Sequence, residues 1–371
     1  MKALEVLLSY ACNEACAFCS QELSWRKAEG LPFALVAREL YAAAKDGFES
    51  VCFTGGEPTL RKDLPQMLAL ARKLGFKYLR VQTNGLKFAE PGYAADLRAA
   101  GATNLRVSIH GDAALHDRLV KVPGAWAKAW AGAEAARTAG LGVGVNYVLN
   151  GENDAALPAF CADLLARGLN DLVVIHPLYE GDLLAHEARM SLPPARAAAA
   201  ARAAAAAYKK AGAEGLRLLN LPPCAAPELT HLMLAWSPHS LLVVDAAGRP
   251  VDLYMASHDD RLHAGPCGSC TLQDECLGFK RSWLKRFPDA GGFAPVAAAP
   301  AAPRSGTRIL RRGGGAFEAG RHELARAVAP VAGQAGGRPA LAVERMSVTL
   351  DADAGRVSES RVVWEEALAH A

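Results

Sequence analysis

Short apolar runs alternate with longer amphipathic runs over the first 211 residues, and this alternation constrains the fold most strongly. Strand-like runs are expected at Leu4–Leu8, Ser50–Phe53, Tyr78–Gln82, Asn104–Ile109, Gly142–Leu149 and Asp171–His176. Helix-like runs follow them at Pro32–Lys45, Leu60–Leu74, Pro91–Ala100, Ala125–Ala139, Asp154–Arg167 and Pro193–Ala211. Such alternation indicates parallel β–α–β units. We therefore predict an α/β fold, a partial (β/α)6 TIM barrel, with its chemistry at the C-terminal ends of the strands.

Composition and charge place the chain among ordinary globular enzymes. Its 371 residues suffice for two or three domains, and a net charge of +3 gives no reason to expect a nucleic acid or a membrane as partner. The apolar run Ala3–Leu8 is too short for a signal sequence, and Arg202 interrupts the alanine-rich stretch around Ala197–Ala207. We expect a cytoplasmic protein, in which clustered thiols stay reduced and bind metal.

The pattern changes after residue 215, and we divide the chain into four parts. The barrel takes residues 1–215, and a small domain with a hairpin at Leu241–Tyr254 and a group of cysteines takes residues 216–290. Residues 291–306 are a Pro/Ala linker, and residues 307–371 are a C-terminal accessory extension of unknown role.

The extension contains a second predicted hairpin, with Asp353–Gly355 at its turn, and a group of arginines runs from the end of the linker into it. The arginines suit either an anionic partner or a solvated face, and we favour the solvated face. They are Arg304, Arg308, Arg311, Arg312 and Arg321.

Three cysteines crowd into eight residues directly after the first predicted strand. Cys12, Cys16 and Cys19 form a C-x3-C-x2-C pattern within "YACNEACAFCS". A disulfide framework needs an even number of cysteines, and a structural zinc site needs four ligands. Three thiolates leave one iron of a four-iron cluster open to another ligand. A zinc site with a distant fourth ligand remains the alternative.

A second motif, "FTGGEPTL" at Phe53–Leu60, follows the second predicted strand at the same end of the barrel. Gly55 and Gly56 allow the backbone to approach a ligand closely, and Glu57 offers a carboxylate to an ammonium group. Pro58 suits the first position of a helix.

Taken in order and spacing, these motifs resemble the radical S-adenosylmethionine (radical SAM) superfamily. The C-x3-C-x2-C pattern has Phe18 before its last cysteine, and Gly-Gly-Glu-Pro follows the second strand. "TNG" at Thr83–Gly85 ends the third strand and "VSIHG" at Val107–Gly111 ends the fourth, as in many members. The resemblance runs over roughly residues 4–215.

The resemblance implies a role for each matching residue. The three cysteines would bind three irons of a [4Fe–4S] cluster, and the fourth iron would bind the amino and carboxylate groups of SAM. Reductive cleavage of SAM would then give a 5′-deoxyadenosyl radical that abstracts hydrogen from the substrate. An electron donor such as flavodoxin or ferredoxin is implied as well. The SAM-binding residues implied are Phe18, Gly55, Gly56, Glu57, Pro58, Thr83, Asn84, Ser108 and Asn146.

Two histidines end predicted strands at the same edge of the sheet. His110 and His176 suit substrate contact or proton transfer, and the alternative is a polar residue that merely closes a strand. His116 and Asp117, in a segment that resembles the loop after the fourth strand in many members, are expected to be structural.

A second group of cysteines follows the predicted hairpin. Cys267, Cys270 and Cys276 form C-x2-C-x5-C, and Cys224 is a candidate fourth ligand. After a radical SAM barrel this arrangement resembles the twitch domain, a shortened relative of the SPASM domain, and implies one fully coordinated auxiliary [4Fe–4S] cluster. A zinc ribbon is the alternative. The remaining cysteines, Cys52 and Cys161, are predicted to be buried packing residues.

Three functions are compatible with these patterns. We favour a radical SAM enzyme that acts on a small molecule or nucleoside in a biosynthetic pathway, because Cys12 leaves no room before the barrel for a peptide-recognition domain. The first alternative is a maturase of a ribosomally synthesised peptide. The second is a non-catalytic iron–sulfur or zinc-binding scaffold, which would not need the Gly55–Pro58 motif.

Overall fold

The computed structural model describes most of the chain in detail. The described residues are 3–21, 26–27, 30–234, 242–244, 250–252, 261–273, 276, 278–288, 293–297, 320–328, 341–351 and 356–367. Among them, no helix has the length and hydrophobicity that crossing a membrane requires.

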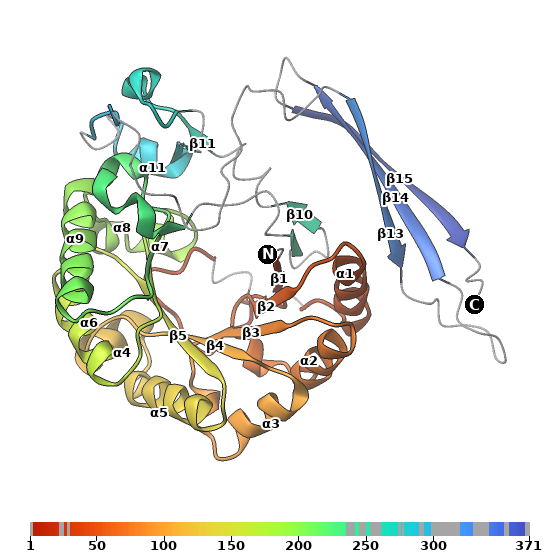
Figure 1. The fold of residues 1–371 in the computed structure, drawn as a ribbon, viewed down its shortest axis with the longest axis horizontal. Coiled ribbons are helices and arrows are strands. Elements are labelled where there is room, and N and C mark those ends of the chain that lie inside the picture. The colour runs from red at the N-terminus through yellow and green to blue at the C-terminus, as the bar shows by residue number, and fades with distance from the viewer. Residues whose placement is uncertain are drawn as a thin grey trace.

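Parallel strands curl into a half-barrel that holds the site (Figure 1). Neighbours in sequence are neighbours in the sheet from β1 to β8, and every one of these pairs is parallel. Parallel order follows because a helix or a connecting segment returns the chain to the starting edge after each strand. The strands are β1 Ala3–Leu7, β2 Ser50–Thr54, β3 Tyr78–Thr83, β4 Asn104–Ser108, β5 Gly142–Val148, β6 Leu172–Ile175, β7 Leu216–Leu219 and β8 Met233–Leu234.

Helices cover the convex face of the sheet (Figure 1). Their buried faces and the outward-facing strand residues form one continuous hydrophobic core. The α-helices are α1 Phe33–Lys45, α2 Leu64–Lys73, α3 Tyr93–Ala100, α4 Ala113–Val120, α5 Ala125–Thr138, α6 Leu157–Ala166, α7 Asp182–Ala185, α8 Glu187–Met190 and α9 Pro194–Lys210. Short 3-10 helices are η2 Pro58–Leu60, η3 Lys87–Ala89, η4 Asp154–Ala156, η5 Pro223–Ala225, η6 Pro227–Leu232 and η7 Gly265–Ser269.

The predicted partial TIM barrel is confirmed, and its sheet is larger than the six predicted strands. β7 and β8 extend it beyond residue 215. The predicted hairpin forms as β9 Leu242–Val244 and β10 Pro250–Asp252, but it also joins the barrel's sheet, because β9 pairs in parallel with β1. The chosen boundary at 215/216 therefore does not coincide with an end of the sheet.

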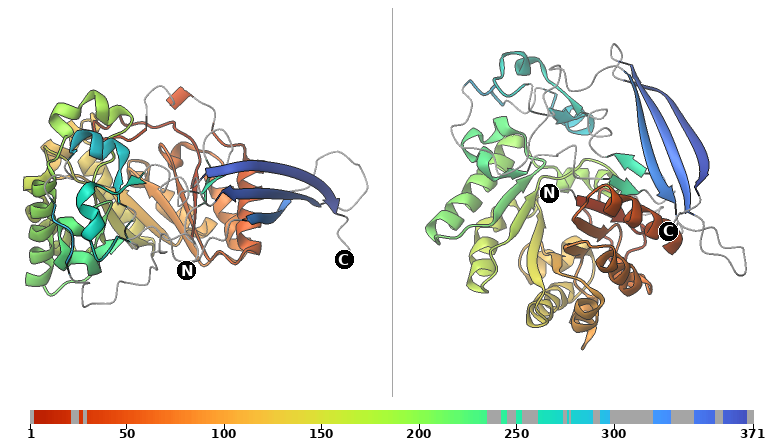
Figure 2. Two further views of the ribbon diagram at one scale, coloured as in Figure 1. Left: turned by 90° about the horizontal axis from the view of Figure 1, so that it is seen from above. Right: turned by 45° about the vertical axis from the view of Figure 1, so that its right-hand side comes forward.

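Two smaller units follow the barrel. β11 Arg261–Leu262 pairs with β12 Phe279–Lys280 and is followed by α11 Arg281–Arg286. β13 Gly320–Val328, β14 Leu341–Asp351 and β15 Arg356–Ala367 form an antiparallel three-stranded sheet, which lies beside α1 (Figures 1 and 2).

Pairing of β14 with β15 agrees with the hairpin predicted in the extension. Its turn at 353–355, most of the linker 291–306, and the arginines before residue 320 lie outside the described residues. The segment with His116 and Asp117, predicted as a loop, is the helix α4.

Candidate active site

The first three cysteines meet at a cavity inside the C-terminal mouth of the half-barrel. Cys12, Cys16 and Cys19 are partly buried in the loop after β1. They line a cavity of about 300 Å³ together with residues from the ends of the strands. The cavity has the position that the barrel fold reserves for chemistry.

Backbone hydrogen bonds hold the cysteine loop in place from two sides. Ala15 and Ala17 donate to the carbonyls of Val120 and Leu119 at the end of α4, at 3.1 and 2.9 Å. Leu183 in α7 donates to the Cys19 carbonyl at 3.0 Å. These hydrogen bonds attach the loop to α4 on one side and to α7 on the other.

Gly55 and Gly56 are required because the cysteine loop lies directly against them. A Cβ atom on Gly55 would stand 2.4 Å from the Ser9 carbonyl oxygen, and one on Gly56 would stand 2.1 Å from that of Ala11. Gly56 also donates its N–H to Ser9 at 2.7 Å. Both glycines line the cavity as well, so the motif serves both the loop and the space beside it.

The Glu57 carboxylate is occupied by the protein, which differs from the predicted contact with an ammonium group. Glu57 is 1% exposed, and it accepts hydrogen bonds from the Thr59 N–H and hydroxyl, the Thr83 hydroxyl and the Asn84 N–H, all between 2.6 and 2.9 Å. Neither Glu57 nor Pro58 lines the cavity. Glu57 thus joins the second strand's loop to the end of β3.

The end of β3 is joined to the cysteine loop by an asparagine pair. The Asn84 side-chain amide donates to the Asn13 side-chain oxygen at 2.7 Å, while its own oxygen accepts from the Leu86 N–H. Thr83 and Asn84 both line the cavity. Asn13 was not singled out from the sequence, because nothing in its local pattern marks a partner 71 residues away.

His110 presents a neutral ring to the cavity. Burial lowers the pKa of His110 well below its usual value, and the residue is 1% exposed. Its Nδ1 accepts a hydrogen bond from the Val148 N–H at 3.1 Å, so the ring's proton is on Nε2. Phe18 packs edge-on against it, with ring centroids 4.5 Å apart. His110 therefore offers a hydrogen-bond donor to a ligand.

His116 and Asp117 have structural contacts, as expected. His116 Nδ1 accepts from the His110 N–H at 3.2 Å, and Asp117 accepts from the N–H groups of Gly124 and Trp126. Of the other predicted SAM contacts, Ser108 lines the cavity and Asn146 does not.

The thiols fit a metal-binding role chemically. Burial raises the pKa of the Cys12 thiol to about 11 and that of Cys16 well above its usual value. Without metal the thiols keep their protons at neutral pH, and a metal must displace them. Glu14, 5% exposed, has its pKa raised to about 8 by burial and accepts the Cys16 S–H at 3.4 Å.

Several cavity residues escaped the sequence analysis. They are polar or charged side chains on strands and on the cysteine loop, where burial cannot be read from local sequence. Glu5 alone carried a signal, since it is an acid within an otherwise apolar strand. The missed residues are Glu5, Glu14, Gln21, Arg26, Thr54 and Gln82.

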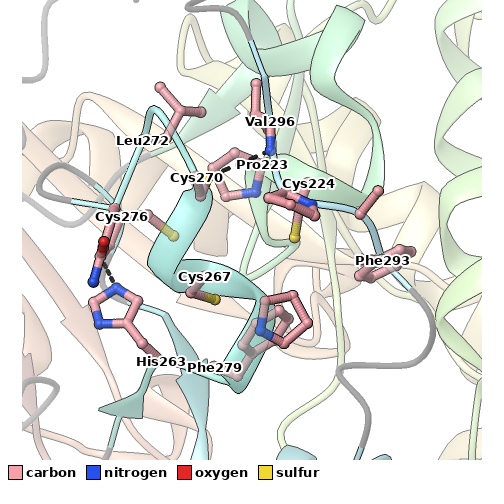
Figure 3. Close-up of a pocket in the computed structure, with 14 residues that line it drawn as sticks. Pro223, Cys224, His263, Cys267, Cys270, Leu272, Cys276, Phe279, Phe293 and Val296 are labelled. Atoms are coloured by element: carbon pink, nitrogen blue, oxygen red, sulfur yellow. Dashed lines mark hydrogen bonds between the residues drawn. The ribbon is translucent and has the colours of Figure 1, made fainter.

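The second group of cysteines also meets at one cavity (Figure 3). Cys224 on η5 lies with Cys267, Cys270 and Cys276 around a space of about 30 Å³. Burial raises the pKa of Cys224 to about 12, and the other three thiols add to the shift. The N–H groups of Gly278 and Val296 point to Cys276 and Cys270 sulfurs at 3.3 and 3.4 Å.

Each group of cysteines places several thiols around one cavity. No three Cys, His, Asp or Glu side chains among the described residues have the arrangement that holds one metal ion. Zinc needs its ligands within about 2.3 Å of one point, whereas a cuboidal cluster binds each cysteine to a different iron.

His176 does not line the cavity with the first cysteines. It lies 4% exposed in a separate space of about 20 Å³ between the barrel and α11, with its ring edge-on to Trp283 at 5.6 Å. Burial lowers the pKa of His176 to about 4. This placement gives no support to a catalytic role.

One hydrophobic cluster joins the two cysteine sites. It contains Phe18 of the first cysteine loop and Phe279 and Trp283 of the second segment, and Cys16, Cys224 and Cys267 pack against it. The lone cysteines Cys52 and Cys161 are buried in the barrel, as predicted.

The half-barrel, the three cysteines at its mouth and the glycine-rich loop beside them are the features by which the sequence resembles the radical SAM superfamily. Residues 6–164 match the model of the radical SAM superfamily. The chain therefore contains a radical SAM domain.

Two curated relatives each match about half of the chain. PqqA peptide cyclase of Xanthomonas euvesicatoria pv. vesicatoria is 34% identical over 191 residues, which are 51% of this chain and 50% of that protein. The probable GTP 3′,8-cyclase of Saccharolobus solfataricus is 32% identical over 196 residues, 50% of this chain and 61% of that protein. The chain thus spans about half of one relative and three-fifths of the other.

Among solved structures, Streptococcus suis SuiB bound to S-adenosylmethionine has a similar fold. The TM-score is 0.60 at 16% sequence identity, and the match covers 80% of this chain and 76% of that chain.

Proposed function

We propose that this protein is a radical SAM enzyme that modifies a ribosomally synthesised peptide. The observation that carries the proposal is the meeting of Cys12, Cys16 and Cys19 at an open cavity, in a domain that matches the radical SAM superfamily. The three cysteines would hold a [4Fe–4S] cluster, and Gly55, Gly56, Thr83, Asn84 and Ser108 would line the space for SAM.

When bound, the cluster and SAM would supply radical chemistry that can remove hydrogen from an unactivated carbon. The chain's own residues position the reactants and exclude water. Phe18 and Val148 give the cavity apolar walls, and His110 Nε2–H gives it a fixed donor.

A peptide substrate is supported by the relative PqqA peptide cyclase, whose name states that it acts on a peptide. SuiB, with a similar fold, is also known bound to the precursor peptide SuiA. This reverses the preference for a small substrate that the sequence alone suggested, because that preference rested only on the short segment before Cys12.

A nucleotide is the second candidate substrate. The relative that supports it is the probable GTP 3′,8-cyclase, with 32% identity over 196 residues. The net charge of +3 favours neither candidate.

We assign an auxiliary [4Fe–4S] cluster to Cys224, Cys267, Cys270 and Cys276, because all four line one cavity. With four protein ligands such a cluster has no open iron, which suits electron transfer or structural support. The electron that starts catalysis would come from a flavodoxin- or ferredoxin-type donor.

The test is anaerobic reconstitution with iron and sulfide, followed by SAM and dithionite. The enzyme is expected to form 5′-deoxyadenosine, and fully iron-loaded protein that forms none would exclude the enzymatic function and leave a scaffold. Mass spectrometry of peptide and nucleotide fractions from cells with and without the enzyme then separates the substrates. Added GTP tests the nucleotide directly, since a cyclised product would contradict the peptide proposal.

A further inference from the structure

Glu5 reaches the cavity at a deeper level than the neighbouring strand residues. Side chains alternate along β1, so Glu5 and Leu7 both face the lumen, and both line the cavity. Leu7 is level with Thr54 near the C-terminal end of β2. Glu5 lies two residues earlier, about 7 Å further from the cysteine loop. The floor of the cavity thus contains a carboxylate.

This carboxylate has no hydrogen-bonding partner among the described residues. The charge that acts on it most directly is Arg80 of β3, yet burial dominates and raises the pKa of Glu5. Arg80 does not line the cavity, and the strand register places Cys52 between the two residues. A partly buried carboxylate that lines a cavity without a hydrogen-bonding partner is poorly stabilised, so a donor that arrives with a ligand would stabilise it.

The other charged groups of the cavity leave the floor acidic. Arg26 is the cation among the described residues that line it, and its guanidinium donates to the Glu14 carbonyl near the cysteine loop. Glu14 lies on that side as well, where it accepts the Cys16 S–H, and it does not change the charge at the floor. His110 is neutral, so it does not offset Glu5.

We propose that Glu5 binds a cationic group, an ammonium or a guanidinium, at the end of the substrate's reacting side chain. The inference rests on the proposed function and adds a specificity to it. A side chain with three or four methylene groups spans about the 7 Å between Glu5 and the strand end. Anchored at its tip, it would hold its inner carbons at the level of the strand ends, in the part of the cavity that the cysteine loop lines.

SAM also contains an ammonium group. The experiment must therefore distinguish the binding of a substrate cation by Glu5 from the binding of SAM. The full-length, reconstituted protein with SAM bound is titrated with n-butylammonium and, separately, with 1-butanol, and binding is followed by saturation-transfer NMR. Wild type is expected to prefer the ammonium at least tenfold, as a charge-assisted hydrogen bond provides. Glu5→Gln should reduce that preference to twofold or less, with SAM affinity and iron content retained.

The control is Glu134→Gln, which removes the same charge from the exposed ion pair with Arg137 and should keep the wild-type preference. An unchanged preference in Glu5→Gln, or a tenfold loss of SAM affinity in it, overturns the proposal.

If Glu5→Gln does not fold, Glu5→Asp is used instead. It is expected to bind n-butylammonium at least threefold more weakly, and unchanged binding again overturns the proposal. The assay involves no SAM cleavage, so its result is independent of whether 5′-deoxyadenosine forms.

Discussion

The Asn84 side-chain amide donates a 2.7 Å hydrogen bond to Asn13 and so connects the end of β3 to the cysteine loop. The Asn84 backbone N–H is bound by Glu57 at the same time. Three motifs that are far apart in the sequence therefore meet at one residue. The positions of the cysteines therefore depend on contacts with the ends of β2 and β3 as well as on the loop that contains them.

The asparagine pair predicts a measurable coupling. In a double-mutant cycle, Asn13→Ala and Asn84→Ala should show an interaction energy of about 1 kcal/mol in urea unfolding, because they share a hydrogen bond. Asn13→Ala combined with Asn170→Ala, before β6, should be additive. An additive Asn13–Asn84 cycle would contradict the shared contact.

Glu57 is predicted to act on stability rather than on the affinity for SAM. Glu57→Gln puts an amide NH2 group among four donors, and we expect it to lower the free energy of unfolding by about 2–3 kcal/mol. The matched control is Glu134→Gln at an exposed site. Calorimetric titration with SAM checks the distinction: a large loss of affinity at unchanged stability would restore the ligand role.

Gly56 should tolerate no side chain. Gly56→Ala drives a Cβ into the Ala11 carbonyl at 2.1 Å, so we expect the cysteine loop to shift and the first cluster's iron to be lost on reconstitution. Gly47→Ala is the informative comparison, because Gly47 has a φ of +76° but open space around it. That variant should cost about 1 kcal/mol and keep its iron. Equal iron contents in both variants would refute the steric argument.

Much of the barrel was predictable because each strand and helix has its own periodic pattern. The predicted strand Asn104–Ile109 and the observed β4 differ by one residue. α4 was missed because its eight residues are too few for a clear period and it follows β4 almost directly. β9 was recognised as part of a hairpin, but its pairing with β1 depends on contacts 238 residues apart in the chain.

The site was predictable where the residues that act together are close in the sequence, as in the two cysteine patterns. The site was not predictable where a residue's role depends on which way its side chain points in the folded protein. Glu57 was assigned to a ligand, yet its carboxylate turns toward Thr59 and Asn84. His176 was expected at the mouth of the barrel, but Trp283, from a segment about a hundred residues later, packs over it.

The buried histidines predict that stability falls on the acid side. Burial lowers the pKa values of His116 and His176 to about 4 from a usual 6.5. The unfolded state therefore binds more protons between these values, so stability is full above pH 6.5 and decreases as the pH falls toward 4. The free energy of unfolding, measured in urea, falls between about pH 7 and pH 5. The substitution His176→Gln should make this fall smaller by about 2 kcal/mol. An unchanged pH slope would show that His176 is not buried neutral.

The two cysteine groups are predicted to load iron separately. A variant with Cys12, Cys16 and Cys19 all changed to Ala should retain about four irons per chain and lose SAM cleavage. Cys161→Ala, at a buried site away from both cavities, is the control and should keep both clusters. Iron analysis with electron paramagnetic resonance checks this. Complete loss of iron in the triple variant would mean that the second site depends on the first.

The chain's passage from β8 to β9 limits how far the half-barrel can open. β8 ends at Leu234 on one edge of the sheet, and β9 begins at Leu242 beside β1 near the opposite edge. Eight residue steps of extended chain reach at most about 28 Å. This covalent connection limits the distance between the end of β8 and the start of β9, whatever the packing between them. While β9 stays paired with β1, the edge of the sheet at β8 cannot move away from β9 by more than this reach.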